Sequence, residues 1–301
     1  GLAISYLKLG EIQKTLGKLD KALAYFENYN LLKKSLHEES PSNVVFKNGL
    51  AISYSKLGEI HQSLGNLDEA LGYFENCNLL AKSLHEDFPS DVVFKNGLAI
   101  SYLKLGEIQK TLGKLDKALG YFENYNLLEK SLHEEFPSNV GFKNSLAISY
   151  SKLGEIHQSL GNLDKALGFY ENDIRLTKSL HEDFPSNVEF NNGLAISYSK
   201  LGEIHQSLGH LDKALAYFEN YNLLKKSLHE DFPSNVGFKN GLAVSYQWLG
   251  WMYEEKGDIA IALGHYQDSE KLLFELTTNS PQYATFQENL KWVQNRLDQL
   301  R

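Results

Sequence analysis

The sequence contains one cysteine, one methionine and no long hydrophobic run. Because Cys77 stands alone, no disulfide can form within the chain, and a reducing, cytoplasmic location is expected. No apolar stretch approaches the ~18 residues that cross a bilayer. Basic residues are fewer than acidic ones: the chain has 30 Lys and Arg and 38 Asp and Glu, which gives a net charge of −8. This balance argues against a general nucleic-acid or anionic-membrane binder.

The dominant feature that is present is a repeat of 48 residues. The phrase GLAISY begins at residues 1, 49, 97 and 193, with SLAISY at 145 and GLAVSY at 241. The first five copies continue as xKLGEIxxxLGxLDxAL, then an aromatic pair and a polar stretch that ends in Pro-Ser. Self-similarity at a fixed period indicates a stacked array, in which each unit buries its apolar face only against its neighbours.

Each unit is expected to form two helices. In the second copy, apolar residues recur at three- and four-residue steps over residues 44–64 and again over 67–88. Gly65-Asn66 interrupts the pattern, and Asp68 follows where a helix N-terminus favours an acid. Pro89-Ser90 ends the second stretch, and Ser90 is expected to cap the next helix.

Asn48-Gly49 leaves two interpretations of the first helix open. The pair is a common turn signal, and a turn here would split the helix. Ser145 stands at the place of Gly49 in the fourth copy and would tolerate a left-handed turn conformation poorly. We therefore favour a continuous helix with a small residue at a close contact.

The repeated residues resemble those of the tetratricopeptide repeat (TPR) family. Residues 54–58 (YSKLG) and 70–74 (ALGYF) match the family pattern W-x2-L-G-x2-Y…A-x3-F, with Tyr in place of Trp. The sixth copy matches more fully, over residues 246–253 (YQWLGWMY) and 262–266 (ALGHY). The resemblance covers essentially the whole chain.

The unit is longer than the ~34 residues of the family pattern. Phe74 to Pro89 spans fifteen positions where the family has eight, and Pro89 to Tyr102 spans thirteen where the family has six. The excess therefore divides equally, and each helix is expected to reach ~20 residues and ~30 Å. With helices of this length, the chain is similar to kinesin-light-chain-like proteins and to bacterial TPR regulatory proteins.

The resemblance implies an all-α fold, a right-handed α-α superhelix or TPR-like solenoid of six helix-pair repeats with a C-terminal capping helix. Lys291 and Asp298 replace the small residues Ala51 and Gly58 of the second copy, as suits a solvated terminal helix. Residues 1–301 are expected to form a single domain. Its repeats are 1–48, 49–96, 97–144, 145–192, 193–240 and 241–281, followed by the capping helix 282–301.

The chain is expected to be a fragment that continues N-terminally. It does not begin with methionine, and its only methionine is Met252. It also opens part-way through a unit, because the segment before Gly49 has no counterpart before Gly1. Any targeting signal upstream would be invisible here.

No catalytic, metal or cofactor site is expected. His61, His157 and His205 share one position of the unit, where neighbouring helices place them ~10 Å apart, whereas zinc needs ligands about 2 Å from one ion. We interpret them as packing residues, and Cys77, which replaces a tyrosine of other copies, likewise. No phosphate-binding glycine loop is present. A second histidine row near helix ends receives the same interpretation: His37, His85, His133, His181 and His229.

The best candidate for function is the face formed by the first helix of each unit. In TPR proteins this helix lines a concave groove that holds a peptide, and the motif places Asn48, Ile52, Ser55, Glu59 and Gln62 there. Their spacings of three and four put them on one helix face. The candidate rows are Asn48, Asn96, Asn144, Asn192 and Asn240, and Glu59, Glu107, Glu155 and Glu203. Amides can bond a peptide backbone, but Lys56 can also neutralise Glu59 on a solvated face.

Trp248 and Trp251 take the places of Lys and Glu on this face in the sixth copy. Exposed tryptophans commonly anchor interfaces. Alternatively, the two rings pack against the capping helix near Trp292. Both interpretations remain open.

The expected function is therefore a non-catalytic scaffold that binds a protein or peptide on the concave face, as the sensor or regulatory arm of a larger protein. The near-identity of the inner units favours an alternative, a structural spacer or self-association module without an exchanging ligand. No nucleic-acid or membrane partner is expected. This functional inference rests on the resemblance to the family.

Overall fold

The computed structural model describes residues 1–301, which form helices and no strand. The chain consists of two compact units, Gly1–Leu160 and Gly161–Arg301. The helices of the first unit are α1 (Leu2–Thr15), α2 (Leu19–Glu39), α3 (Val44–Ser63), α4 (Leu67–Asp87), α5 (Val92–Thr111), α6 (Leu115–Glu135) and α7 (Val140–Ser159). Those of the second are α8 (Leu163–Asp183), α9 (Val188–Ser207), α10 (Leu211–Asp231), α11 (Val236–Glu255), α12 (Ile259–Asn279) and α13 (Ala284–Leu300).

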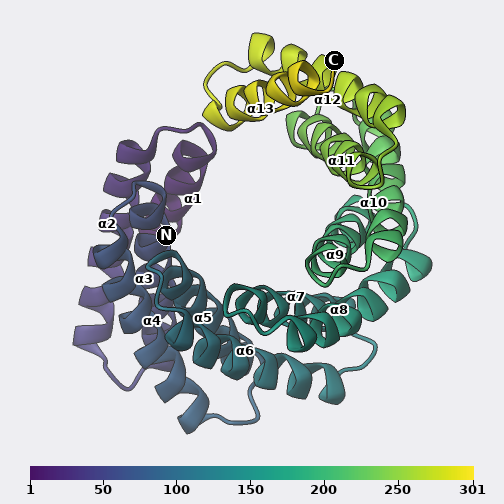
Figure 1. The fold of residues 1–301 in the computed structure, drawn as a ribbon. Coiled ribbons are helices and arrows are strands. Elements are labelled where there is room, and N and C mark those ends of the chain that lie inside the picture. The colour runs from purple at the N-terminus through teal and green to yellow at the C-terminus, as the bar shows by residue number, and fades with distance from the viewer. The chain divides into compact units, whose positions relative to one another are not determined.

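Within each unit, every helix packs against the next one along the chain. Figure 1 shows the odd-numbered helices side by side in one layer of each unit and the even-numbered helices in a second layer. We call the odd-numbered helices the first helices and the even-numbered ones the second helices. None of them combines the length and the hydrophobicity that a membrane span requires. That the two units form one domain over residues 1–301 stays a prediction.

The helix boundaries agree with those predicted from periodicity. In the second copy, α3 ends at Ser63 and α4 begins at Leu67, and both run for about 20 residues. α3 continues through Asn48-Gly49, so the continuous-helix interpretation is confirmed. Gly49 is buried, and an added Cβ would lie 3.0–3.2 Å from the Lys33 side chain. The small residue therefore relieves a close contact rather than forming a turn.

The predicted cap at Ser90 is wrong. The N-cap of α5 is Asp91, whose Oδ1 accepts hydrogen bonds from the backbone N–H groups of Val93 (2.8 Å) and Phe94 (3.2 Å). Ser90 lies one residue too early, in the turn after Pro89. Short Asp and Asn side chains reach the free N–H groups of a helix start. Asparagine makes this cap in the other copies, at Asn43, Asn139, Asn187 and Asn235.

The C-terminal helix α13 closes the second unit as the predicted cap. Phe286, Val293 and Leu297 are buried in a cluster with residues of α11 and α12. Lys291 and Asp298 are exposed. The charged substitutions therefore lie at exposed positions of α13.

Five helix pairs are held by a contact between a glycine of the first helix and an aromatic ring of the second: α1–α2, α3–α4, α5–α6, α9–α10 and α11–α12. Phe74 of α4 is buried, and a Cβ added to Gly58 of α3 would lie 2.5 Å from its ring. Real Cβ atoms do not approach that closely, so the ring occupies the space that only glycine leaves. Gly72, on α4, has no atom within 4 Å of the same added carbon.

Gly58→Ala is expected to lower the free energy of unfolding by about 1–3 kcal/mol, because the added methyl forces the Phe74 ring or the helix to shift. Gly72→Ala is the matched control, and it is expected to raise stability by roughly 0.5–1 kcal/mol through the higher helix propensity of alanine. Urea unfolding followed by circular dichroism measures both. Equal effects of the two substitutions would contradict the proposed close contact.

One buried position of the second helices varies among the copies. It carries Lys33, Ala81, Glu129, Thr177, Lys225 and Leu273. Glu129 is only 1% exposed, its Oε2 has no hydrogen-bond partner, and burial raises the pKa of its carboxyl to about 7. Lys225 is also buried, and desolvation lowers its pKa to about 8. These near-identical units therefore differ in their interior.

Glu129→Gln is expected to stabilise the chain increasingly as the pH rises from 4.5 to about 7. The folded carboxyl holds a proton that the unfolded chain releases, so wild-type stability falls over this interval and then levels off. The difference should reach roughly 3 kcal/mol at the plateau. Glu134→Gln, at an exposed site of the same helix, is the control. A difference independent of pH would rule out titration of Glu129.

Candidate functional site

The first helices carry a surface with one exposed isoleucine in each of five copies. These side chains are 39–54% exposed, although isoleucine is among the residues most often buried. The row is Ile4, Ile52, Ile100, Ile148 and Ile196, and Val244 continues it on α11. Within each unit, we call the surface formed by this row and the flanking Asn and Glu rows the first-helix face. It carries an apolar row as well as polar ones.

The predicted asparagines flank the isoleucines but differ in their surroundings. All five are half-buried. The side-chain amides of Asn48 and Asn96 make no hydrogen bond within the protein. Asn192 Oδ1 accepts a hydrogen bond from Lys225 Nζ at 2.6 Å, and Asn240 Oδ1 is buried without a partner. The amide row is thus uneven, and its contact with a ligand stays a prediction.

The predicted glutamates take part in a ladder of ion pairs between neighbouring first helices. In the first unit, Lys56 Nζ lies 2.7 Å from a carboxylate oxygen of Glu11 on the preceding first helix. Lys104 Nζ lies 3.1 Å from Glu59. The next step joins Lys152 and Glu107 at 3.0 Å. We call this series the ladder. It neutralises the charges of the face internally.

Glu59 has the fullest set of partners. Lys14, Lys56 and Lys104 lie 3.3, 3.6 and 3.1 Å from its oxygens, and 19% of its side chain is exposed. Burial raises the pKa of this carboxyl, but the lysines outweigh burial and hold the pKa below 4.5. Sequence reasoning found only the pair with Lys56 on the same helix. The bonds between helices were missed, although the Lys-x2-Glu spacing recurs in five copies.

The ladder stops in the second unit at α11. Trp248 stands where the ladder requires lysine, and Trp251 where it requires glutamate. Glu203 of α9 therefore receives no lysine from α11. It contacts Lys200 (3.7 Å) and the hydroxyl of Ser199 (3.1 Å), both on its own helix.

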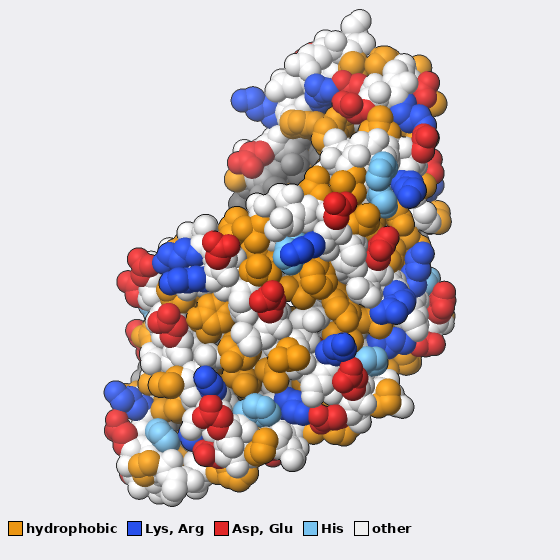
Figure 2. Space-filling view, turned by 60° about the horizontal axis from the view of Figure 1, so that its bottom comes forward, with side chains coloured by type: hydrophobic (Ala, Val, Ile, Leu, Met, Phe, Trp, Pro, Cys, Tyr) orange, Lys and Arg blue, Asp and Glu red, His pale blue; other side chains and the backbone are white.

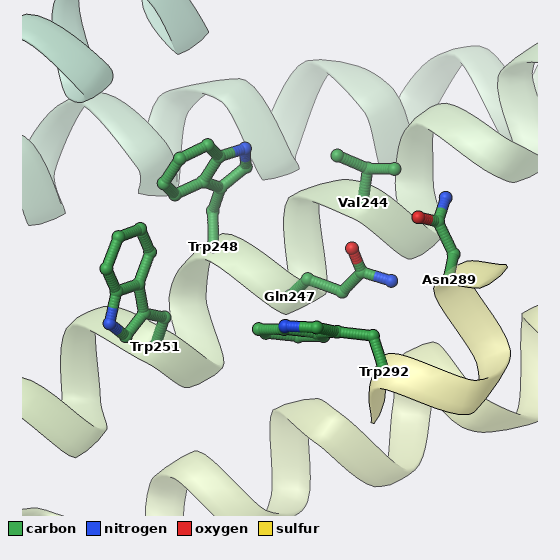
Figure 3. Close-up of a pocket in the computed structure, with 6 residues that line it drawn as sticks. All are labelled: Val244, Gln247, Trp248, Trp251, Asn289 and Trp292. Atoms are coloured by element: carbon green, nitrogen blue, oxygen red, sulfur yellow. The ribbon is translucent and has the colours of Figure 1, made fainter. Parts of the chain in front are cut away.

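The tryptophans line a pocket of about 240 Å³ between α11 and α13. The Trp248 ring stacks on Phe218 of α10, with centroids 4.6 Å apart, and on Trp251 at 5.3 Å. Figure 3 shows side chains of α11 and α13 projecting toward the same hollow. Its lining consists of Val244, Gln247, Trp248, Trp251, Asn289 and Trp292.

Trp248 and Trp251 share the lining of one pocket with Trp292 of the capping helix, but their ring contacts are with Phe218 of α10 and with each other. Trp248 packs against Phe218, and Trp292 meets Tyr266 edge-on at 5.8 Å, so each ring is partly supported by the core. The rings also leave an open pocket on the first-helix face. That this pocket contacts a ligand stays a prediction.

Two histidines of the first predicted row, His61 and His205, stack on tyrosine rings. His61 stacks on Tyr73 with centroids 5.2 Å apart, and His205 stacks on Tyr217 at 5.4 Å. No group of three His, Cys, Asp or Glu side chains is placed to hold a metal ion. Cys77 is buried, and burial raises the pKa of its thiol to about 12. The thiol is therefore protonated at neutral pH, and thiolate is the reactive form.

Glu59→Gln is expected to lower the free energy of unfolding by roughly 1–2 kcal/mol at pH 7. The substitution removes the negative charge of a half-buried carboxylate and leaves the three lysines that contact it without that charge partner. The pKa of Glu59 lies below 4.5, so this contribution exists above pH 4.5 and is lost as the pH falls through the lower value. Urea unfolding at several pH values measures it. Glu203→Gln, without a lysine from the next first helix, should cost less. Equal costs at pH 7 would contradict the importance of the ladder.

Comparison with known proteins supports the assignment of the repeat. Tetratricopeptide repeat models match residues 3–34, 50–87, 149–182 and 195–226. Among curated proteins, none matches this sequence.

Three solved structures show the same fold. BtubC (BKLC) from P. vanneervenii is 19% identical, with 87% of this chain and 92% of that chain covered and a TM-score of 0.67. A putative kinesin light chain with nearly identical TPR-like repeats, from Podosopora anserina, is 17% identical, with 74% and 94% covered and a TM-score of 0.51.

The third is a Signal Transduction ATPase with Numerous Domains (STAND) protein with a tetratricopeptide repeat sensor, from Pyrococcus horikoshii. It is 15% identical, with a TM-score of 0.59, and the match covers 98% of this chain and 42% of that one. At such identities the likeness concerns the fold alone. The repeat matches show that the chain contains tetratricopeptide repeats at these positions, and the stacked helix pairs agree with this assignment, in a unit lengthened to 48 residues.

Proposed function

We propose that the chain is a non-catalytic scaffold that binds a protein or peptide on the first-helix face. Tetratricopeptide repeats typically mediate protein–protein interaction. The observation that carries the proposal is the row of exposed isoleucines on a face whose charges pair with one another. Apolar side chains held at the surface gain free energy when a partner covers them.

The spacing of the row suits an extended peptide. Packed helices lie 8–10 Å apart, and three residues make one turn of an extended polyproline II helix that rises about 9 Å, so every third side chain lies on the same side of the peptide. A peptide with an apolar side chain at every third residue would therefore meet one isoleucine per repeat. Full burial of such a side chain contributes about 1.5–3 kcal/mol to binding. A few such contacts therefore offset part of the free energy that ordering the peptide costs.

Amides beside the isoleucines supply polar recognition. Asn48 and Asn96 are half-buried and offer an N–H donor and a carbonyl acceptor that no group of the protein engages. A peptide backbone presents the complementary groups at each residue. The Glu row contributes less, since the ladder lysines already bind its carboxylates.

A role as the sensor or regulatory arm of a larger protein fits the same proposal. The STAND protein from Pyrococcus horikoshii has a tetratricopeptide repeat sensor, and its fold resembles that of this chain. A repeat face that captures a partner would supply the input of such an arm.

A structural or self-association role is the second candidate, and a row of exposed leucines on the second helices favours it. These side chains are 65–68% exposed. They are Leu31, Leu79, Leu127 and Leu223. The face seen in Figure 2 mixes hydrophobic side chains with both signs of charge. Contact between copies would then use the second helices and leave the first-helix face free.

Two matched variants of the first unit distinguish the candidates. Ile52, Ile100 and Ile148 are changed to Ser in one, and Leu31, Leu79 and Leu127 in the other. Peptides selected from a displayed random library on the wild-type chain are expected to lose at least tenfold in affinity for the isoleucine variant, since three apolar contacts are removed. They should bind the leucine variant unchanged, as measured by isothermal titration calorimetry.

Circular dichroism checks that both variants remain helical, and sedimentation velocity measures self-association. Unchanged affinity for the isoleucine variant would contradict the proposal. Self-association of the wild type that only the leucine variant loses would favour the second candidate.

A further inference from the structure

All three tryptophans of the chain line the pocket between α11 and α13. Each replaces a different residue of the repeat. Trp248 replaces the ladder lysine, Trp251 the ladder glutamate, and Trp292 the exposed isoleucine when Pro281 is aligned with Pro41. The pocket therefore belongs to the first-helix face, at the place where its charged and apolar rows both end.

The interruption of the ladder leaves one carboxylate short of a cation. In the first unit, the lysine of each following first helix places its ammonium 2.7–3.1 Å from a glutamate oxygen. At the same step in the second unit, the ring of Trp248 turns to Phe218 of α10 and brings no charge to Glu203. Glu203 retains only Lys200 of its own helix, at 3.7 Å.

Indole faces attract cations, because the ring quadrupole is negative over the face, and tryptophan is the strongest such partner. The exposed Glu255 accepts a hydrogen bond from Trp251 Nε1 at 3.3 Å and adds negative charge beside the rings. Arg296 of α13 is paired with Glu254. The amides of Gln247 and Asn289 offer acceptor oxygens at the lining.

The size of the pocket limits its occupant. A volume of about 240 Å³ lies below the range of sites for whole small molecules and suits one long side chain. The net charge of −8 favours approach of a basic partner. Resting on the proposed function, we propose that this pocket binds a lysine or arginine side chain of the peptide on the first-helix face. The ligand cation lies among the indoles, beside the exposed carboxylate of Glu255, at the step where α11 lacks the ladder lysine.

Intrinsic fluorescence tests this directly, because every tryptophan of the chain lines the pocket. The probes are acetylated, amidated hexapeptides of alanine that differ only at one central residue: lysine, arginine, norleucine or glutamate. The lysine and arginine peptides are expected to change the emission saturably and to bind at least tenfold more tightly than the norleucine peptide. Their affinity should fall as salt is added, since the attraction is electrostatic.

Two variants identify the groups responsible. Trp248→Lys restores the residue of the other five copies, and its ammonium is expected to pair with Glu203 and to weaken the lysine peptide at least tenfold. Glu255→Gln should weaken the lysine peptide several-fold and leave norleucine unchanged. Glu134→Gln, at an exposed site of the other unit, is the control and should alter neither. Indole N–H signals in NMR spectra check that each variant remains folded.

Equal or tighter binding of the norleucine peptide would overturn the proposal in favour of an apolar pocket. The proposal would also be overturned if the lysine and arginine peptides did not change the tryptophan emission, or if Trp248→Lys bound the lysine peptide as tightly as the wild type does. The proposed function fails separately: peptides selected on the first-helix face would then keep their affinity when Ile52, Ile100 and Ile148 are changed.

Discussion

The contact between a first-helix glycine and the aromatic ring of the next helix is the constraint on which the rest of the structure depends. It recurs between Gly58 and Phe74 and between Gly202 and Phe218, and tyrosine supplies the ring at Gly250. Without a Cβ, the first helix lets the ring lie directly against its backbone. The two helices of each pair are thereby held at one distance. The outward sides of the first helices then repeat at regular intervals, which the ladder requires.

The same contact supports the aromatic pocket. Phe218 is held under Gly202 on one side, and Trp248 stacks on it at 4.6 Å. Trp251 stacks on Trp248 in turn. A buried repeat contact thus positions two rings at the surface of the second unit. The tryptophans need no support of their own beyond the aromatic residue that every helix pair already contains.

The fold could be predicted from the sequence because its determinants are local and repeated. Periodicity placed α3 and α4 within one residue of their ends, and the serine at position 145 favoured a helix through Gly49. The cap at Asp91 was missed, since Ser90 and Asp91 are both good N-caps and their adjacent positions differ only in where the helix starts. The ladder was missed because a spacing within one helix does not show which rows of neighbouring helices meet.

Features that break the repeat were harder to predict than features that obey it. The occupants of the Glu129 position range from lysine to leucine, a variation that does not indicate burial, and only packing shows that Glu129 and Lys225 are buried there. Trp248 and Trp251 were recognised as exceptions, yet their pocket depends on Trp292, which is more than forty residues away in the sequence. Side-chain direction decides such sites, and periodicity does not report it.

Near-identity of the repeats has a consequence for how the first unit can recognise a ligand. α3, α5 and α7 present almost the same isoleucine, amide and ladder residues, and α1 the same isoleucine and ladder residues, so a peptide shifted by one repeat would make nearly the same contacts. Several registers of similar free energy then compete, and the contacts add affinity without fixing position. In the second unit, α9, α11 and α13 differ from one another at the isoleucine and ladder rows, and α13 also departs at the amide row. A ligand residue that fits only the aromatic pocket would have one register there. Specificity therefore depends on the place where the repeat fails, because only a unique contact distinguishes one register from the next.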